Sequence, residues 1–189
     1  MNQTRENLKF VGQWLKKPLQ TGAIMPSGKE LAALIVRDVV PNKGRVIEFG
    51  GGTGAFTQAL LDKGVPPEQL EIIEINPDFA DGLRARFPSV TIIEASAAVL
   101  DDVVAGAAGS YAFVVSGLPL LSIPKPVREA IVAQAFRLLA ADGEMFQFSY
   151  SPRCPISKAV LSDYNLVAIK SGACPKNIPP AYVFRITRV

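Results

Sequence analysis

The 189-residue sequence has no histidine, and it has only two cysteines and one tryptophan. Without an imidazole the chain can form neither a Ser-His-Asp triad nor a histidine metal site, and it has no histidine general base. Cys154 and Cys174 are too few for a disulfide scaffold or a thiolate zinc site, so we expect no bound metal. The N-terminus lacks the apolar core of a secretory signal, which predicts an intracellular protein.

A long hydrophobic run is also lacking. The uncharged stretch 103–124 is interrupted by three glycines and two prolines, so it predicts a strand and loops rather than a membrane span. Hydrophobic residues make up 49% of the chain and charged residues 20%, which is typical of a folded globular domain. The length suits one domain.

Charge is distributed unevenly along the chain. Residues 1–29 carry a net charge of +4, residues 30–150 carry −6, and residues 151–189 carry +5. Basic ends suit an anionic surface, either lipid or nucleic acid. Ordinary solvated charge would explain the same distribution, so the pattern alone leaves the partner open.

The first segment, residues 4–17, predicts an amphipathic helix that ends at Pro18. One interpretation is that this helix docks on an anionic membrane, and the other is that its apolar stripe packs on the domain's own core. The stripe consists of Leu8, Val11 and Leu15, widened by Phe10 and Trp14, and the membrane-facing candidates are Lys9, Phe10, Trp14, Lys16 and Lys17.

The remainder of the chain alternates strands with helices, which predicts a parallel sheet covered by helices on both faces. A helix capped by Ser27, with Glu30 at the capping-box position, runs to about Val40. The expected strands are 45–50, 70–75, 90–95, 111–116, 145–150, 166–171 and 181–188, and further helices cover 55–63, 77–87 and 126–139. The last two strands form an antiparallel pair. The predicted fold class is α/β, a Rossmann-like, seven-stranded, mostly parallel sheet.

A glycine-rich loop joins the first expected strand to its helix. It reads Glu48-Phe49-Gly50-Gly51-Gly52-Thr53-Gly54, and glycines allow positive φ and a close approach of the backbone to a ligand. Glu74 ends the next strand, where a carboxylate can accept both hydroxyls of a ribose. Strand, loop, helix, strand and acid together predict a nucleoside cofactor, although a glycine-rich turn without a ligand would share part of this pattern.

The spacing Glu-x-Gly-x-Gly-x-Gly resembles the first motif of class I S-adenosylmethionine methyltransferases, and it departs from the dinucleotide pattern. The resemblance implies S-adenosyl-L-methionine as cofactor and a methyl transfer as the reaction. The implied cofactor contacts are Glu48, Gly50, Gly52, Thr53, Gly54, Glu74, Ile75, Ser96, Ala97, Ser116 and Ser27. Many such enzymes carry an acidic residue where this chain has Ser96. Ser96 would accept the hydrogen bond from the adenine amino group more weakly than a carboxylate does.

The loop after the fourth strand, Ser116-Gly117-Leu118-Pro119-Leu120-Leu121, lies where class I methyltransferases place catalytic residues. Adenine-N6 enzymes have an aromatic ring at the position of Leu120, where it stacks on the flipped base. Leucine has no π-face, so the loop favours an aliphatic substrate over a nucleobase. We expect Leu118, Pro119, Leu120 and Leu121 to bind substrate, with burial in the core as the alternative.

Several segments together resemble bacterial phospholipid N-methyltransferases of the soluble, membrane-associated type. They are residues 14–18, 22–29, 47–50, 74–79, 116–121, 147–150 and 177–181, and the Ser-Gly-Leu-Pro-Leu-Leu loop is the most specific. The resemblance implies N-methylation of phosphatidylethanolamine or a related amine lipid at the cytoplasmic face of the inner membrane. Gly51 departs from the family, which usually has proline there. Residues 1–40 would then form a membrane- and substrate-facing lid, and residues 41–189 the cofactor-binding domain.

The implied reaction is an in-line attack by a lipid amine on the sulfonium methyl group, after the amine has lost a proton. Tyr150 is the candidate to orient the amine, and Ser116 is the candidate acceptor for the ammonium proton. Tyr150 could instead be a packing residue at the sheet end. Two other functions remain open at this point: an rRNA adenine N6-methyltransferase, and a non-catalytic cofactor-binding protein at a membrane.

Overall fold

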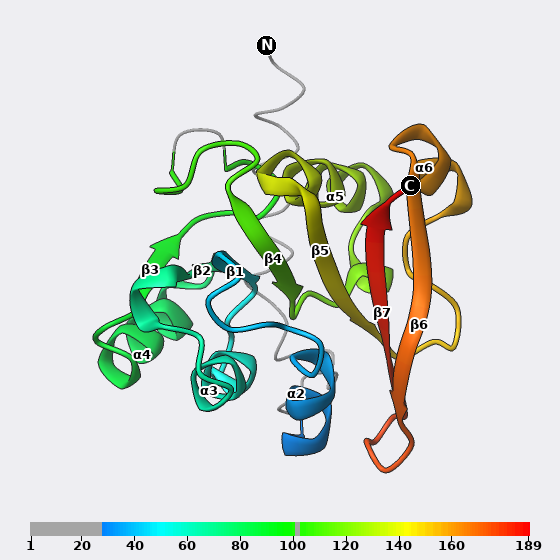
Figure 1. Ribbon diagram of the computed structural model, residues 1–189. Coiled ribbons are helices and arrows are strands. Elements are labelled where there is room, and N and C mark those ends of the chain that lie inside the picture. Colours follow the sequence, from blue (N-terminus) through cyan, green and yellow to red (C-terminus); the bar gives the residue numbers. More distant parts are fainter. Residues whose placement is uncertain (1–27, 101–102) are drawn as a thin grey trace.

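The computed structural model describes residues 28–100 and 103–189 (Figure 1). Its helices are α2 (Lys29–Ile35), α3 (Ala55–Asp62), α4 (Pro77–Arg86), α5 (Lys125–Leu138) and α6 (Lys158–Asp163). Its strands are β1 (Arg45–Phe49), β2 (Leu70–Glu74), β3 (Thr91–Glu94), β4 (Tyr111–Ser116), β5 (Leu139–Ser149), β6 (Leu166–Cys174) and β7 (Ala181–Arg188). Within these ranges no helix is both long and apolar enough to cross a membrane.

The strands form one seven-stranded sheet in the order β3-β2-β1-β4-β5-β7-β6. The first five strands along the chain pair in parallel, and β7 pairs antiparallel with both β5 and β6. The chain moves outward in one direction from β1 to β3 and then returns to the other side of β1 with β4. Ligands bind at such a reversal, outside the carboxyl ends of the strands, so the topology places the site after β1 and β4.

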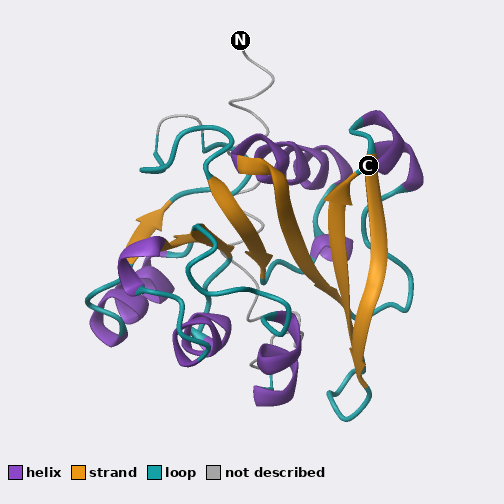
Figure 2. Ribbon diagram, in the orientation of Figure 1, coloured by secondary structure: helices purple, strands orange, loops and turns teal. Residues whose placement is uncertain are grey.

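Helices cover both faces of this sheet (Figure 2). On one face, Leu31 of α2, Leu60 of α3 and Leu83 of α4 pack with Val46 and Phe113. On the other face, α5 and α6 pack against the alternate residues of the same strands. Neighbouring residues in a strand point to opposite faces of the sheet. Because these strands are apolar at nearly every position, both faces are apolar and both are buried under helices.

The predicted fold class is confirmed, and the element boundaries differ in a few places. The helix expected to reach about Val40 ends at Ile35, and Gly28 rather than Ser27 occupies its N-cap position. The strand expected at 145–150 begins at Leu139, directly after α5, because Leu139 and Glu144 pair with Tyr111 and Phe113 at the start of β4, with a register shift between them. Helix α6 was not predicted. Ser27 and the membrane candidates Lys9, Phe10, Trp14, Lys16 and Lys17 lie outside the described residues.

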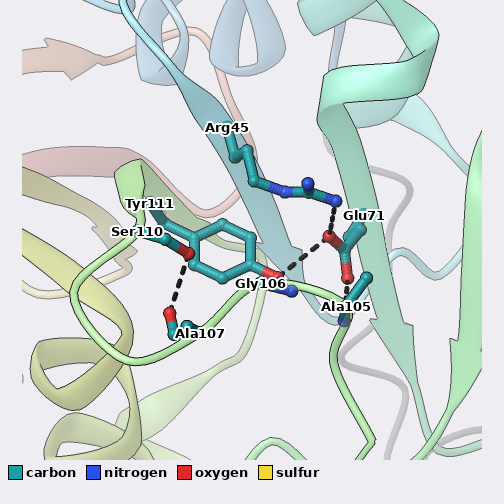
Figure 3. Close-up of polar contacts among 7 residues, drawn as sticks. All are labelled: Arg45, Glu71, Ala105, Gly106, Ala107, Ser110 and Tyr111. Carbon is teal, nitrogen blue, oxygen red and sulfur yellow. Dashed lines mark hydrogen bonds and ion pairs between the residues drawn. The ribbon is translucent and has the colours of Figure 1, made fainter.

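A buried polar network lies at the amino ends of the central strands (Figure 3). Glu71, which is 1% exposed, accepts hydrogen bonds from Arg45 Nη2 at 2.8 Å, from the Tyr111 hydroxyl at 2.9 Å and from Ala105 N at 3.1 Å. Gly106 N donates to the Tyr111 hydroxyl at 3.0 Å. Burial raises the pKa of Tyr111 to about 12, so it stays a neutral phenol. The network fixes the segment that leads into β4.

We expect Tyr111→Phe to lower the free energy of unfolding by about 1–3 kcal/mol, because Glu71 and Gly106 N would each lose a buried partner. Urea unfolding measures the loss. Tyr164→Phe is the matched control, since Tyr164 is 44% exposed. Equal stabilities for the two variants would contradict a stabilising role for the network.

Candidate active site

The glycine-rich loop leaves β1 in a conformation that suits glycine. Gly50, Gly52 and Gly54 have φ values of 79°, 50° and 80°, which side chains other than glycine rarely adopt. Gly50 N donates to Ile73 O at 2.7 Å, so the loop is tied to the end of β2. The loop therefore lies across the carboxyl ends of β1 and β2.

The same loop contacts the segment after β4. A Cβ atom on Gly50 would lie 2.6 Å from Leu118 Cδ2, and one on Gly117 would lie 2.7 Å from Gly50 O. Gly117 N donates to Phe49 O at 2.8 Å. In contrast, a Cβ on Gly52 would meet nothing within 4 Å. Gly52 therefore faces open space, as a loop that receives a ligand must.

Gly51 is the position where the resembling family usually carries proline. A side-chain atom there would lie 2.5 Å from Ile72 Cγ2 and 2.7 Å from Leu83 Cδ1. Bulky neighbours on β2 and α4 therefore occupy the space that a proline ring would need. This close packing accounts for the glycine in this chain.

Glu74, the predicted ribose acid, lies at the end of β2 and is 7% exposed. Its Oε2 accepts from Gly52 N at 2.8 Å, and its Oε1 accepts from Asn76 N at 2.8 Å. Each carboxylate oxygen has a further lone pair, so both remain able to accept a hydroxyl. Glu74 thus holds the loop in place at the point where a ribose would bind.

Glu48 is fully buried beneath this loop. Thr57 of α3 donates to its Oε2 at 2.7 Å, whereas Oε1 has no partner among the described residues. Burial, assisted by the charge of Glu74, raises the pKa of Glu48 to about 8. At neutral pH the carboxyl is therefore mostly protonated, and its Oε1 is buried within the protein.

Two further predicted cofactor contacts follow the ends of β2 and β3. Ile75, directly after β2, packs against the core on the α5 face, and Ala97, after β3, is 7% exposed. Ser96 Oγ accepts from Ala98 N at 3.3 Å, which gives this segment its turn. Because the hydroxyl is engaged locally, Ser96 retains only its O–H and its second lone pair for an adenine.

Ser116 and Tyr150, the two predicted catalytic residues, differ in their surroundings. Ser116 is fully buried at the end of β4, and its Oγ has no partner in the described parts of the chain. Tyr150 lines a pocket of about 120 Å³ beside the loop after β4. The pocket wall consists of Pro119, Leu120, Leu121, Ser122, Phe148, Ser149, Tyr150 and Pro155. Three of the four predicted substrate contacts line this pocket, and Leu118 lies instead against Gly50.

Leu120 and Leu121 differ in exposure. Leu120 is 1% exposed and belongs to the core cluster, so most of its side chain packs in the core, which was the alternative to substrate binding. Leu121 is 52% exposed. Burial raises the pKa of the Tyr150 hydroxyl, which keeps it a neutral phenol that can orient an amine but does not serve as a base at neutral pH.

Several supporting residues were not among the predicted site residues. Gln147 donates from Nε2 to Leu118 O at 2.9 Å and so holds the loop after β4. Phe148 and Pro155 complete the pocket wall, and Thr57 positions Glu48. A glutamine within the apolar segment Met145-Phe146-Gln147-Phe148 was the available signal, since a buried amide needs partners.

The strand order, the glycine loop and the acid after β2 define a class I S-adenosylmethionine-dependent methyltransferase. Residues 46–143 match the family described as "Methyltransferase domain", and the chain belongs to this family. The predicted cofactor and enzyme class are therefore confirmed.

Two kinds of curated relative are similar in sequence. Ornithine lipid N-methyltransferase of Singulisphaera acidiphila is 30% identical over 148 residues, which cover 76% of this chain and 77% of that protein. Ribosomal RNA small subunit methyltransferase A of Chromohalobacter salexigens is 35% identical over 113 residues, which cover 58% of this chain but 38% of that protein.

Solved structures share the fold at low identity. A TehB-like SAM-dependent methyltransferase from Corynebacterium glutamicum superposes with a TM-score of 0.64 at 16% identity, covering 98% of this chain and 100% of the other. Magnesium protoporphyrin IX methyltransferase from Synechocystis, solved with bound SAM, gives 0.64 at 14% identity, covering 100% of this chain and 85% of the other.

The residues at the carboxyl edge fit S-adenosylmethionine. Gly52 leaves open space, and each carboxylate oxygen of Glu74 keeps a lone pair for a ribose hydroxyl. When bound, the cofactor supplies an electrophilic methyl group. The chain's own residues hold the glycine-rich loop in place, and Tyr150 lines the pocket beside the loop after β4.

Proposed function

We propose that the protein transfers a methyl group from S-adenosylmethionine to the amine of a membrane lipid, either phosphatidylethanolamine or a related lipid such as an ornithine lipid. The observation that carries this proposal is the apolar pocket beside the cofactor edge, lined by Leu121 and Tyr150. The lipid N-methyltransferase that matches three quarters of this chain supports it. The pocket wall also carries the rings of Phe148 and Tyr150, so the preference for a lipid over a base is supported by the lipid N-methyltransferase relative rather than by the wall alone.

In this proposal, Tyr150 accepts or donates a hydrogen bond at the amine and so sets its direction of attack. Desolvation beside the leucines lowers the pKa of the amine and favours the neutral form that has a lone pair. Ser116, the predicted proton acceptor, is fully buried and is not part of the pocket wall, so we assign proton loss to solvent at the pocket mouth.

We extend the proposal to location. The basic and apolar N-terminal segment, with Lys9, Phe10, Trp14, Lys16 and Lys17, would hold the protein peripherally on an anionic membrane at the cytoplasmic face of the inner membrane. Its lysines would meet lipid headgroups, and its aromatic side chains would enter the interface.

The direct test incubates the protein and labelled S-adenosylmethionine with each acceptor in turn. The acceptors are vesicles containing phosphatidylethanolamine, vesicles containing ornithine lipid, and ribosomal RNA. Label in either lipid supports the proposal and identifies the headgroup. The RNA arm addresses the shorter match to rRNA methyltransferases. Label in RNA alone would refute the lipid assignment, and cofactor binding without any transfer would indicate a non-catalytic protein.

Leu121→Asp tests the pocket without disturbing the core, because Leu121 is 52% exposed whereas Leu120 is 1% exposed. We expect kcat/KM for a short-chain amine lipid to fall about 10-fold, since a charge would replace apolar contact, and cofactor affinity to stay unchanged. Val167→Asp on β6, at 40% exposure, is the control. If both variants retain parental activity, the pocket does not bind the substrate.

A further inference from the structure

The C-terminal end of α4 contacts the glycine-rich loop. Arg86, the last residue of α4, donates from Nη1 to Thr53 O at 2.9 Å and from Nη2 to Gln58 Oε1 at 3.1 Å. Thr53 belongs to the loop, and Gln58 belongs to α3, into which the loop leads. Helices α3 and α4 are neighbours on one face of the sheet (Figure 1). One guanidinium group therefore joins the loop to both helices.

The guanidinium of Arg86 is itself held in place by Phe87. Its carbon lies over the Phe87 ring, 4.7 Å from the ring centre, and Phe87 is 6% exposed. The same ring packs against the loop, because a Cβ atom on Gly54 would lie 2.6 Å from Phe87 Cε2. Stacking on a buried ring restricts the arginine, so less entropy is lost when its planar fork forms hydrogen bonds. Arg86 therefore differs from a freely moving cation on the surface.

The peptide group between Thr53 and Gly54 is engaged at both of its polar atoms. Its carbonyl accepts from Arg86, and its N–H group donates to Gly51 O at 2.8 Å. The acid at the end of β2 holds the preceding part of the loop. Glycine loses more conformational freedom on ordering than any other residue, so a loop this rich in glycine depends on such contacts to keep one conformation.

We propose that Arg86 is a positioning residue for S-adenosylmethionine, which holds the glycine-rich loop in its binding conformation before the cofactor arrives. A loop that is ordered in advance lowers the entropy cost of binding, so affinity rises without a direct contact to the ligand. The alternative is that Arg86 only complements the helix dipole at the end of α4, as Arg84 in the same turn also does. This role concerns the cofactor and does not depend on which acceptor is methylated.

Arg86→Gln tests this role by calorimetric titration of the full chain with S-adenosylmethionine. We expect Kd to rise about 10-fold, because the loop would lose a bond to its backbone and would have to be ordered during binding. Arg84→Gln is the matched control. It removes the same charge from the same turn, and Arg84 contacts Asp81 at 2.7 Å and Glu94 at 3.8 Å rather than the loop. Its Kd should stay within about 2-fold of the parental value.

Arg86→Lys separates positioning from charge. Lysine keeps the positive charge, but it has no planar fork that could bond Thr53 and Gln58 together while stacking on Phe87. We therefore expect Arg86→Lys to recover little of the affinity that Arg86→Gln loses. Full recovery would mean that positive charge alone is sufficient, and it would overturn the inference.

Amide hydrogen exchange of the cofactor-free protein is a readout that a purely stabilising role would not produce. In Arg86→Gln we expect the Gly52 and Gly54 amides to exchange about 10-fold faster, while the amides of β1 and β4 keep their parental rates. Equally faster exchange throughout the protein would indicate general destabilisation and would contradict the positioning role. So would equal Kd values for Arg86→Gln and Arg84→Gln. None of these measurements involves an acceptor, so failure of the proposed lipid function would leave their outcome unchanged.

Discussion

Replacing Glu74 with alanine is expected to weaken binding of S-adenosylmethionine by roughly 100-fold. The carboxylate accepts from Gly52 N and Asn76 N, both at 2.8 Å, and its removal leaves two backbone donors at the cofactor edge without their partner. The loosened loop and the lost bonds from ribose hydroxyls to a charged acceptor both weaken the complex. Bonds to a charged group contribute about 1.5–3 kcal/mol each, and about 2.7 kcal/mol corresponds to 100-fold.

Glu94→Ala is the control for this prediction, because Glu94 is the register partner of Glu74 on β3. Its side chain is 48% exposed and lies 3.8 Å from Arg84, so its removal should leave cofactor affinity nearly unchanged. Calorimetric titration of both variants makes the comparison. If Glu74→Ala binds the cofactor as tightly as the parent while remaining folded, the cofactor site has been placed wrongly.

The fold could be predicted because its signals are local. Strands such as Tyr111–Ser116 are short apolar runs bounded by glycine or polar residues, and the order of strands and helices follows directly from them. The start of β5 could not be predicted, since Ala141-Asp142-Gly143 has the composition of a turn. The flanking residues Leu139 and Glu144 pair with β4, and Arg188 donates to Ala140 O, so contacts on either side hold this stretch at the sheet.

The site was predictable where backbone geometry determines the residue type. Gly50 and Gly52 require positive φ, and Glu74 ends β2 at a place fixed by the topology. The environment of each side chain was not predictable, because it depends on contacts that are distant in sequence. Ser116 ends one buried strand and Tyr150 directly follows another, yet Ser116 is fully buried and Tyr150 lines the pocket. Sequence position alone could not separate those two outcomes.

Glu48 is the buried carboxyl whose titration should be measurable in the stability of the whole protein. Burial first, and then the charge of Glu74, raise its pKa from 4.5 to about 8, although the Thr57 hydroxyl opposes this shift. The folded protein therefore holds a proton that the unfolded chain releases. Stability from this group is fully present below about pH 4.5 and is lost as the pH rises through about 8.

We expect the free energy of unfolding of the cofactor-free parent to fall by about 1.4 kcal/mol per pH unit between about pH 5.5 and about pH 7.5. Glu48→Gln keeps a carbonyl acceptor for Thr57 but carries no charge, so its stability should be nearly flat over this range. At about pH 7.5 the variant should then be the more stable protein by on the order of 3 kcal/mol.

The measurement is urea unfolding at several pH values. It compares the parent, Glu48→Gln and the exposed control Glu94→Gln, and it gives the pH dependence of the free energy of unfolding for each. The chain has no histidine, so no other side chain has an ordinary pKa inside this window, and a slope there belongs to a strongly shifted group. The control should keep the parental slope. A flat parental profile would mean that Glu48 is ionised in the folded protein, and its buried carboxylate would then have to be stabilised by a partner other than Thr57.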